Sequence, residues 1–309
     1  MIIGFETGKR HNDKIVEGFV HHRDNAYFQT FDRSNVRDQY KDNLIFAKNP
    51  LPKDVDHKWQ ALDVDMKNNH ATAFVWWGFL RSTKKLYRQA LKRKIDFFFL
   101  DHSYFYHKIH HQKKSGIDLI KNPFVRVVKN GFVIDKIIDT DERGLKNLSQ
   151  LGKEDFEVKK WKKTGSKIVV LPPSFHMCDF LDLKHEDVLN DMISNIKKHT
   201  DREIVIRYKK PDGIHNPKPI EEEIADAWAV VSFQSNAVVK FILNGVPSFT
   251  YMDKHSVACP VSLTDFSKIE NPWYPDNRYE WLCNICNNQF QERFVYSGHV
   301  MDYLNRMVK

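Results

Sequence analysis

Short apolar runs alternate with longer amphipathic stretches along most of the chain, a pattern typical of parallel α/β proteins. Apolar runs bounded by polar turns predict strands near positions 1–6, 27–31, 44–47, 73–77, 95–100, 167–171, 202–207, 228–232 and 248–251. Apolar positions at helical spacing predict helices near 14–21, 81–94, 188–196, 237–244 and 277–307. This order of strands and helices predicts a parallel sheet in each half of the chain.

A charged stretch with little apolar periodicity, at 135–166, is predicted to contain the boundary between the two halves. We expect an α/β fold of two Rossmann-like domains that face each other across a cleft, followed by a C-terminal helical tail. The predicted bounds are 1–140 for the first domain, 141–276 for the second and 277–309 for the tail. The tail is expected to pack back on the first domain.

The composition indicates a well-packed interior. The 309 residues are 41% hydrophobic and 13% aromatic. No apolar run approaches the roughly 20 residues that span a bilayer, and the first residues lack the basic-then-apolar layout of a signal peptide. Four cysteines, Cys178, Cys259, Cys283 and Cys286, form no spaced disulfide framework. We therefore expect a cytoplasmic protein with no membrane partner.

The segment most informative about function is a strand–turn–helix–strand unit at 227–251. Its first strand ends at Ser232, its polar turn holds Gln234, Ser235 and Asn236, and Gly245 ends its helix. Parallel sheets bind ligands at the carboxyl ends of their strands, and the N–H groups at a helix start bind phosphate. These polar residues are therefore candidates for a phosphorylated ligand. The alternative is that Ser235 or Asn236 only caps the helix.

Two other predicted strands of the second half also end in polar residues. Ser174 and His176 follow the strand near 167–171, and Arg207 and Lys209 follow the next strand. Cationic side chains at this edge could neutralise a phosphate group. The alternative is that Arg207 and Lys209 are only solvated surface residues.

The net charge of +8 is unevenly placed. The predicted helix at 81–94 contains no acidic residue and carries Arg81, Lys84, Lys85, Arg88, Lys92, Arg93 and Lys94. A second basic run lies at 107–114. Two cationic segments in one half of the chain favour a polyanionic partner, with nucleic acid first, although such a face can also be only solvated.

Motifs for metal, redox or dinucleotide chemistry are weak. Cys283 and Cys286 form a Cys-x-x-Cys pair, but zinc needs two more ligands at a plausible spacing, so packing within a helix is the favoured role. Three Asp-x-Asp motifs, at 54/56, 63/65 and 139/141, do not clearly end a buried strand. No Gly-x-Gly-x-x-Gly follows a predicted strand, which argues against a dehydrogenase. We expect no metal and no cofactor.

Several segments resemble a known family in their order along the chain. They are Trp76-Trp-Gly-Phe79, Leu100-Asp-His-Ser-Tyr-Phe105, Val205-Ile-Arg-Tyr-Lys-Lys-Pro211, Ala227-Trp-Ala-Val-Val-Ser232, Ser235-Asn236-Ala237, Asn244-Gly-Val-Pro247 and 269–290. In these segments, spread over about 72–298, the chain resembles the bacteriophage-encoded, GT-B-like glycosyltransferases of the DNA-base-modifying type. It is more distantly similar to capsule-polysaccharide sugar transferases. The resemblance implies a nucleotide-sugar donor bound mainly by the second domain and an acceptor bound mainly by the first.

The predicted site residues follow from this division. The donor site is expected at Ser174, His176, Arg207, Lys209, Ser232, Gln234, Ser235 and Asn236. The acceptor site is expected at Gly8, Lys9, His11, Trp77, Gly78, Arg81, Lys84, Lys85 and Arg88. Sugar transfer also needs a base near the acceptor hydroxyl and positive charge or N–H donors at the departing phosphate. Asp101 and His102, at the predicted end of one strand, and Glu6, at the end of the first, are the candidate bases.

The predicted function is metal-independent transfer of a sugar from a nucleotide sugar to a hydroxymethylated pyrimidine in phage DNA. Fixed cations take the place of a metal, and the donor is the sole small-molecule requirement. Two alternatives stay open: a capsule or lipopolysaccharide sugar transferase, and a non-catalytic nucleic-acid-binding α/β protein.

Overall fold

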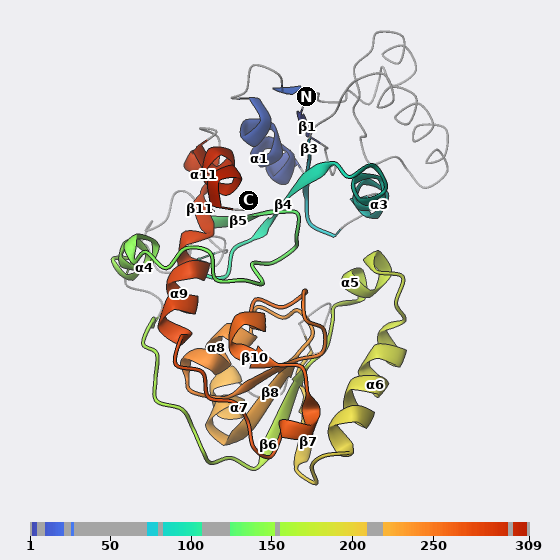
Figure 1. Cartoon of the computed structure of the whole chain (residues 1–309), viewed down its shortest axis with the longest axis vertical. Coiled ribbons are helices and arrows are strands. Elements are labelled where there is room, and N and C mark those ends of the chain that lie inside the picture. The colour runs from blue at the N-terminus through green and yellow to red at the C-terminus, as the bar shows by residue number, and fades with distance from the viewer. Residues whose placement is uncertain are drawn as a thin grey trace. The chain divides into compact units, whose positions relative to one another are not determined.

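The computed structural model describes residues 2–4, 10–21, 26–27, 73–79, 83–106, 124–151, 155–208, 219–295 and 299–307 (Figure 1). The chain divides into two compact units. Unit 1 combines Met1–Phe132 with Gln289–Lys309, and unit 2 is Val133–Asn288. The C-terminal segment therefore belongs to the same unit as the N-terminal half of the chain.

Unit 1 is built on a six-stranded sheet of order β11-β5-β4-β3-β1-β2. Its strands are β1 (Ile2–Gly4), β2 (Ala26–Tyr27), β3 (Ala73–Trp77), β4 (Asp96–His102), β5 (Phe124–Lys129) and β11 (Gln289–Gln291). Its helices are α1 (Arg10–His21), α3 (Thr83–Arg93), α10 (Glu292–Val295) and α11 (His299–Met307). The pairs among β1 to β4 are parallel, whereas β5 is antiparallel to β4 and β11 is antiparallel to β5.

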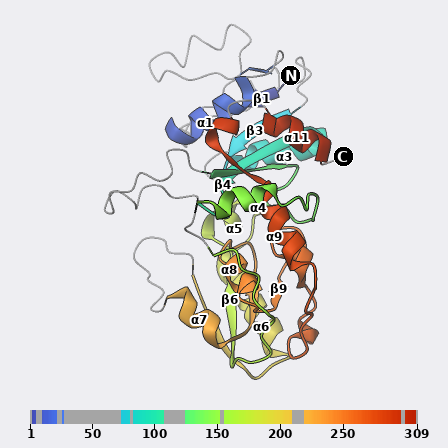
Figure 2. The ribbon, with the colours of Figure 1, turned by 90° about the vertical axis from the view of Figure 1, so that its left-hand side faces the viewer.

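Successive side chains of β3 point to opposite faces of this sheet, as the geometry of a strand requires. Val75 and Trp77 join a core with residues of α1, α10 and α11. Trp76 faces the other way and stacks on Phe97, with 5.0 Å between the ring centroids, and Phe97 in turn contacts Tyr87 of α3. Helices thus cover both faces of the sheet (Figure 2).

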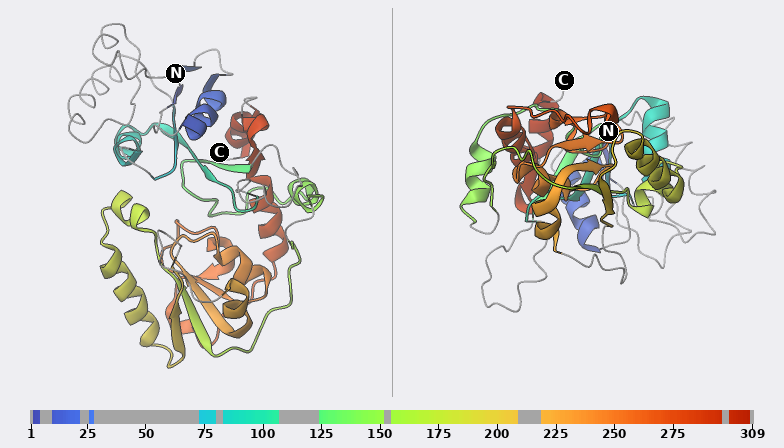
Figure 3. Two further views of the ribbon diagram at one scale, coloured as in Figure 1. Left: turned by 180° about the vertical axis from the view of Figure 1, so that it is seen from behind. Right: turned by 90° about the horizontal axis from the view of Figure 1, so that it is seen from below.

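Unit 2 is built on a five-stranded, wholly parallel sheet of order β10-β9-β8-β6-β7. Its strands are β6 (Lys167–Leu171), β7 (Glu203–Ile206), β8 (Ala227–Ser232), β9 (Ser248–Thr250) and β10 (Ser262–Leu263). Its helices are α4 (Arg143–Ser149), α5 (Phe175–Phe180), α6 (His185–Lys197), α7 (Ile220–Asp226), α8 (Val238–Leu243) and α9 (Arg278–Asn287). Seen from behind in Figure 3, α6 lies on one side of the sheet, and α7 and α8 lie on the other.

The predicted fold class, an α/β chain with two Rossmann-like sheets, is confirmed. The C-terminal tail is not wholly helical, because Gln289–Gln291 forms β11 against β5 between two helical segments. The units also change at Phe132/Val133 rather than at 140/141, and α9 groups with unit 2. The strand expected at 44–47 lies outside the described residues. Among the helices that the structure does describe, none has the length and apolar character needed to cross a membrane.

Gly245 ends α8 in a conformation that other residues resist. Its φ is +80°, and a Cβ built there would lie 2.0 Å from the carbonyl oxygen of Lys160. The segment around Lys160 is held against this turn, because the N–H of Lys162 donates to the carbonyl oxygen of Gly245 at 2.8 Å. The close approach of two backbone segments therefore requires glycine at this position.

We expect Gly245→Ala to lower the free energy of unfolding by about 3 kcal/mol, because left-handed strain adds to a clash with backbone. Gly78→Ala is the matched control. Gly78 also has a positive φ, +64°, but a Cβ there would meet no atom of the described residues within 4 Å. The control should therefore lose only about 1 kcal/mol. Denaturant unfolding followed by circular dichroism measures both values, and equal losses would contradict the role of the clash.

Candidate functional site

The strand order of unit 2 creates a topological switch point between β6 and β8. From β6 the chain crosses to β7 on one side, and from β8 it crosses to β9 on the other. The loops after β6 and β8 therefore diverge, and this opens the kind of crevice in which doubly wound sheets bind ligands. The two strand ends are level, because Leu171 pairs with Ser232 and the N–H of Phe233 donates to the carbonyl oxygen of Leu171 at 3.1 Å.

The predicted donor residues at the ends of β6 and β8 flank this switch point. Ser174 is the N-cap of α5, and its Oγ accepts the N–H of Met177 at 3.2 Å. Ser235 Oγ accepts the N–H of Ala237 at 3.3 Å. Both serines therefore shape their loops, but Ser235 does not cap α8, whose N-cap is Ala237. His176 is exposed on α5, and Gln234 is half-buried.

Ser232 differs from these serines. Its side chain is wholly buried at the carboxyl end of β8, and its hydroxyl forms no hydrogen bond within the part of the chain that the structure describes. Buried hydroxyl groups are nearly always paired, and leaving one unpaired costs about 1–3 kcal/mol. An unpaired hydroxyl at a switch point is therefore a group that a bound ligand or water would satisfy.

The helix after this turn begins later than predicted. α8 starts at Val238, and its N-cap Ala237 offers no side-chain cap. The preceding turn is tight, because the N–H of Val238 donates to the carbonyl of Ser235, and the N–H of Val239 to that of Asn236, both at 3.2 Å. Ser235 and Asn236 thus belong to a turn before the helix, and α8 has only six residues.

Arg207 follows β7 at the same edge of the sheet. Its N–H donates to the carbonyl oxygen of Val170 at 2.9 Å, which continues the pairing of β6 with β7. Its guanidinium Nη1 lies 2.9 Å from Oε2 of Glu223, a buried residue of α7. The positive charge of Arg207 is therefore matched within unit 2. Lys209 lies outside the described residues.

Two residues at the end of β9 and after it, Thr250 and His255, were not predicted from the sequence as site residues. Thr250 is the register partner of Ser232 and is likewise buried. The His255 ring lies parallel to that of Phe233, at 6.1 Å between centroids. Burial lowers the pKa of His255, which the nearby Asp135 carboxylate opposes, and burial raises the pKa of Asp135. His255 is therefore neutral near pH 7. The sequence contains a signal for both, because they lie at the end of the strand predicted at 248–251 and just after it.

In unit 1, Asp101 lies within β4 and is engaged by its neighbours. One carboxylate oxygen accepts Nη2 of Arg126 at 2.8 Å, and the other accepts the N–H of His102 at 2.8 Å. Arg126 is 3% exposed, and its guanidinium lies near the rings of Phe99 and Tyr104. The ion pair thus anchors a buried arginine between two strands. His102, the last residue of β4, is exposed.

Some predicted acceptor residues lie at the carboxyl edge of unit 1 and others do not. Gly78 follows β3 there, and its N–H donates to the carbonyl oxygen of Leu100 at 2.8 Å. Trp77 is a core residue, 4% exposed, because alternation along β3 turns it inward. On α3, Arg88 is exposed and Lys84 is half-buried. Glu6, Gly8, Lys9 and Arg81, and the side chains of His11 and Lys85, lie outside the described residues.

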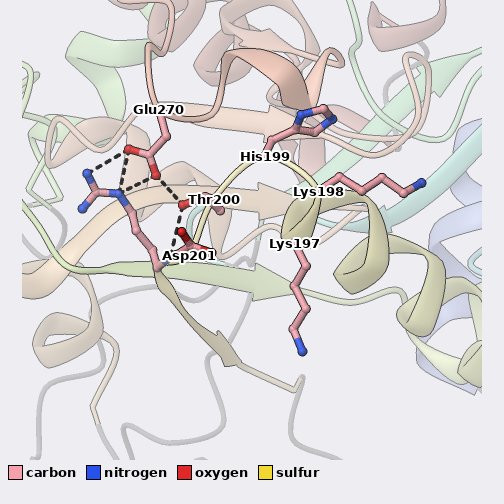
Figure 4. Close-up of a pocket in the computed structure, with 7 residues that line it drawn as sticks. Lys197, Lys198, His199, Thr200, Asp201 and Glu270 are labelled. Carbon is pink, nitrogen blue, oxygen red and sulfur yellow. Dashed lines mark hydrogen bonds and ion pairs between the residues drawn. The ribbon is translucent and has the colours of Figure 1, made fainter.

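A shallow pocket of about 520 Å³ lies at the opposite, amino edge of the unit 2 sheet (Figure 4). It is lined by Lys197, Lys198, His199, Thr200, Asp201, Arg202 and Glu270. Three of its polar side chains are hydrogen-bonded to one another: Arg202 donates to both oxygens of Glu270 at 3.0 and 3.1 Å, and Thr200 donates to the same carboxylate. Arg202 also covers the Trp228 ring at 4.0 Å. This cluster ties the start of β7 to the loop that holds Glu270.

The described residues contain no group of three histidine, cysteine, aspartate or glutamate side chains that could hold a metal ion. Asp141, in the one Asp-x-Asp motif within the described ranges, accepts both the N–H and the Nε of Arg143. Cys283 and Cys286 are buried free thiols of α9, and burial raises the pKa of each. Thiols of this kind are inert, which agrees with the packing role expected for the pair.

The structure is that of an α/β protein with two Rossmann-like units, in which polar residues follow the strands at the switch point of unit 2. No family model matches the chain, and no curated protein matches it. Among solved structures it is similar to Thermosulfurimonas dismutans KpsC, a beta Kdo 2,7 transferase, with a TM-score of 0.46 and 11% identity over 98% of this chain and 99% of that one. It is also similar to the KpsC beta Kdo 2,4 transferase of the same organism, with a TM-score of 0.44 and 9% identity over 100% and 98%.

We expect Ser232→Ala to leave the free energy of unfolding unchanged or to raise it by about 1 kcal/mol, because it removes an unpaired buried hydroxyl. Ser248→Ala is the control. Ser248 is a buried serine of β9 whose Oγ bonds to Val261 and Ser262. Its replacement should lower stability by about 1 kcal/mol. Denaturant unfolding of both variants is the measurement. A loss at Ser232 as large as that at Ser248 would show that the Ser232 hydroxyl is already paired.

Proposed function

We propose that the chain is a glycosyltransferase that takes a sugar from a nucleotide-sugar donor bound at the carboxyl edge of unit 2. The observation that carries the proposal is the switch point between β6 and β8, where the buried hydroxyl of Ser232 has no hydrogen-bond partner among the described residues. The phosphate groups of a nucleotide sugar carry many acceptor oxygens, which hydroxyl and N–H groups at such an edge can bind.

A transferase must also bind an acceptor, and unit 1 supplies a second sheet with a carboxyl edge of its own. Its parallel strands have the order β2-β1-β3-β4, which puts a second switch point between β1 and β3. Gly78 lies at that edge, and no described atom would lie within 4 Å of a Cβ built on it. Two ligand-binding edges in one chain suit a two-substrate reaction better than a simple binding module.

Arg207 is the residue proposed to neutralise the departing phosphate. Its ion pair with Glu223 holds the guanidinium at the exit of β7, and a guanidinium binds phosphate through charge-assisted hydrogen bonds. Lys209 is proposed for the same task. With cationic side chains in place of a metal ion, the transfer is proposed to need no metal.

His102 is proposed as the base that takes the proton from the acceptor hydroxyl. It is exposed at the end of β4, whereas both carboxylate oxygens of Asp101 already accept hydrogen bonds from Arg126 and His102. Imidazole also titrates near neutral pH, which suits general base catalysis. Asp101 is proposed to position His102 through its backbone N–H. Glu6 stays the alternative base.

The proposed acceptor is a hydroxymethylated pyrimidine in DNA. The support is the cationic surface of α3, which has no acidic residue and on which Arg88 and Lys92 are exposed. Basic side chains on one helix face bind a phosphate backbone without reading its sequence. An anionic glycan acceptor, as in a capsule or lipopolysaccharide transferase, and a non-catalytic nucleic-acid binder are the alternative outcomes of the tests.

The proposal is tested by incubating the protein with a panel of nucleotide sugars and DNA that contains hydroxymethylated cytosine or uracil. Nucleoside mass spectrometry should then detect a hexose-type mass increase with one donor. We expect His102→Gln to abolish transfer while donor affinity and stability are unchanged, because it removes only the proton acceptor.

Asp101→Asn separates the two neighbours. It leaves the buried Arg126 without its counter-ion, so we expect a stability loss of about 3 kcal/mol together with partial transfer activity. Full activity of His102→Gln with none in Asp101→Asn would reverse the two roles. If a nucleotide sugar binds measurably but no donor of the panel yields a modified base, the result would point to a glycan acceptor.

DNA binding should weaken steeply with added salt, because basic side chains release counterions from the phosphates. Replacing Arg88 and Lys92 together by Ala should reduce the slope of log K against log salt by about 2. The control is the double replacement of Lys197 and Lys198 by Ala, which removes the same charge from the amino edge of unit 2. Fluorescence anisotropy measures both. Equal slopes for the two variants would exclude α3 as the DNA-binding surface.

A further inference from the structure

Three aromatic rings gather where β6 and β7 end. Phe175 is the first residue of α5, His185 is the first residue of α6, and Tyr208 follows Arg207 after β7. The Phe175 and His185 rings stack with 4.1 Å between their centroids and 27° between their planes. His185 and Tyr208 continue the series at 6.4 Å and 31°. Residues that are far apart in the sequence thus form one stack at the carboxyl edge of unit 2.

Phe175 ends this stack with a ring that the described residues leave largely exposed. Its side chain is 60% exposed, although phenylalanine side chains are ordinarily buried. The core contacts of α5 come from Met177, Cys178 and Phe180 instead. The Ser174 cap fixes the backbone beside the ring. Phe175 is therefore held in place by a cap and by His185, with one ring face open.

The position of the stack suits the base of a nucleotide. β6 lies between β7 and β8, so the loop that carries Ser174 and Phe175 borders both neighbouring strand ends. Two strand spacings, about 10 Å, separate the exits of β7 and β8. This is comparable with the distance in a nucleotide from its base to its phosphates. If the base lies on Phe175, the phosphates therefore come near Arg207 and the end of β8.

We propose that the open face of the Phe175 ring stacks on the nucleobase of the donor, an inference that rests on the proposed function. Every nucleobase has a π-face, and stacking on an aromatic side chain tolerates different bases. The platform therefore supplies affinity for the nucleotide part of the donor, while choice among bases is left to polar groups around it.

The test is isothermal titration of the whole protein with the 5′-mono- and diphosphates of uridine, cytidine, guanosine and adenosine, and with inorganic diphosphate. We expect Phe175→Ala to lower the affinity for the tightest-binding nucleotide by roughly ten- to a hundredfold and to leave the affinity for inorganic diphosphate unchanged. Phe175→Trp should restore binding, and its added fluorescence should be quenched by the nucleotide. Trp273→Ala is the control, because Trp273 is 45% exposed in the same unit but lies three residues after Glu270 of the amino-edge pocket.

The outcomes separate this inference from the proposed function. If a nucleotide binds and Phe175→Ala behaves like Trp273→Ala, the stacking is overturned while the donor proposal stands. An equal loss for nucleotide and inorganic diphosphate also overturns it, because the ring would then only shape the Ser174 loop. If neither nucleotides nor nucleotide sugars bind the unaltered protein, both proposals fail together.

Discussion

The parallel pairing of β6 with β8 is the constraint on which the candidate site depends. These strands are not consecutive, yet they pair from Lys167 to Leu171 against Ala227 to Ser232. The pairing forces β7 to one side of β6 and β9 to one side of β8, so the connecting loops must separate above the pair. Ser174, Phe175, Ser232 and Arg207 share one edge only because this register holds.

Unit 1 repeats the order and then completes its sheet differently. After β4 the chain adds β5 antiparallel, and the edge strand β11 comes from the C-terminal segment. Gln289 of β11 then accepts the N–H groups of Tyr104 and Phe105, both at 3.0 Å, and so fixes the backbone that follows His102. The region around the proposed base is thus ordered by residues from the far end of the chain.

Much of the fold could be predicted from the sequence, because buried parallel strands are continuous apolar runs. β3 lies where the run at 73–77 predicted it. β5 was missed because Arg126 and Lys129 interrupt its apolar positions, and β11 because a three-residue strand is defined by its partner more than by its own residues. In the site, strand exits could be found by sequence, but the partners of Asp101 and Arg207 could not, since Arg126 and Glu223 lie on other elements.

The charged residues of the predicted site already have partners in the structure. Arg207 was predicted to bind phosphate and Asp101 to act as a base, and each is paired with a buried residue of opposite charge within its own unit. Breaking such a pair costs much free energy, because it leaves a buried charge without its partner. These residues can therefore contact a substrate only with the donor and acceptor atoms that the pair does not use. Ser232 and Phe175 carry no charge, yet among the described residues the buried hydroxyl of Ser232 has no hydrogen-bond partner and the ring of Phe175 is 60% exposed. A ligand gains most from groups that the fold has positioned and left unsatisfied, which makes these two the strongest structural support for the proposed donor edge.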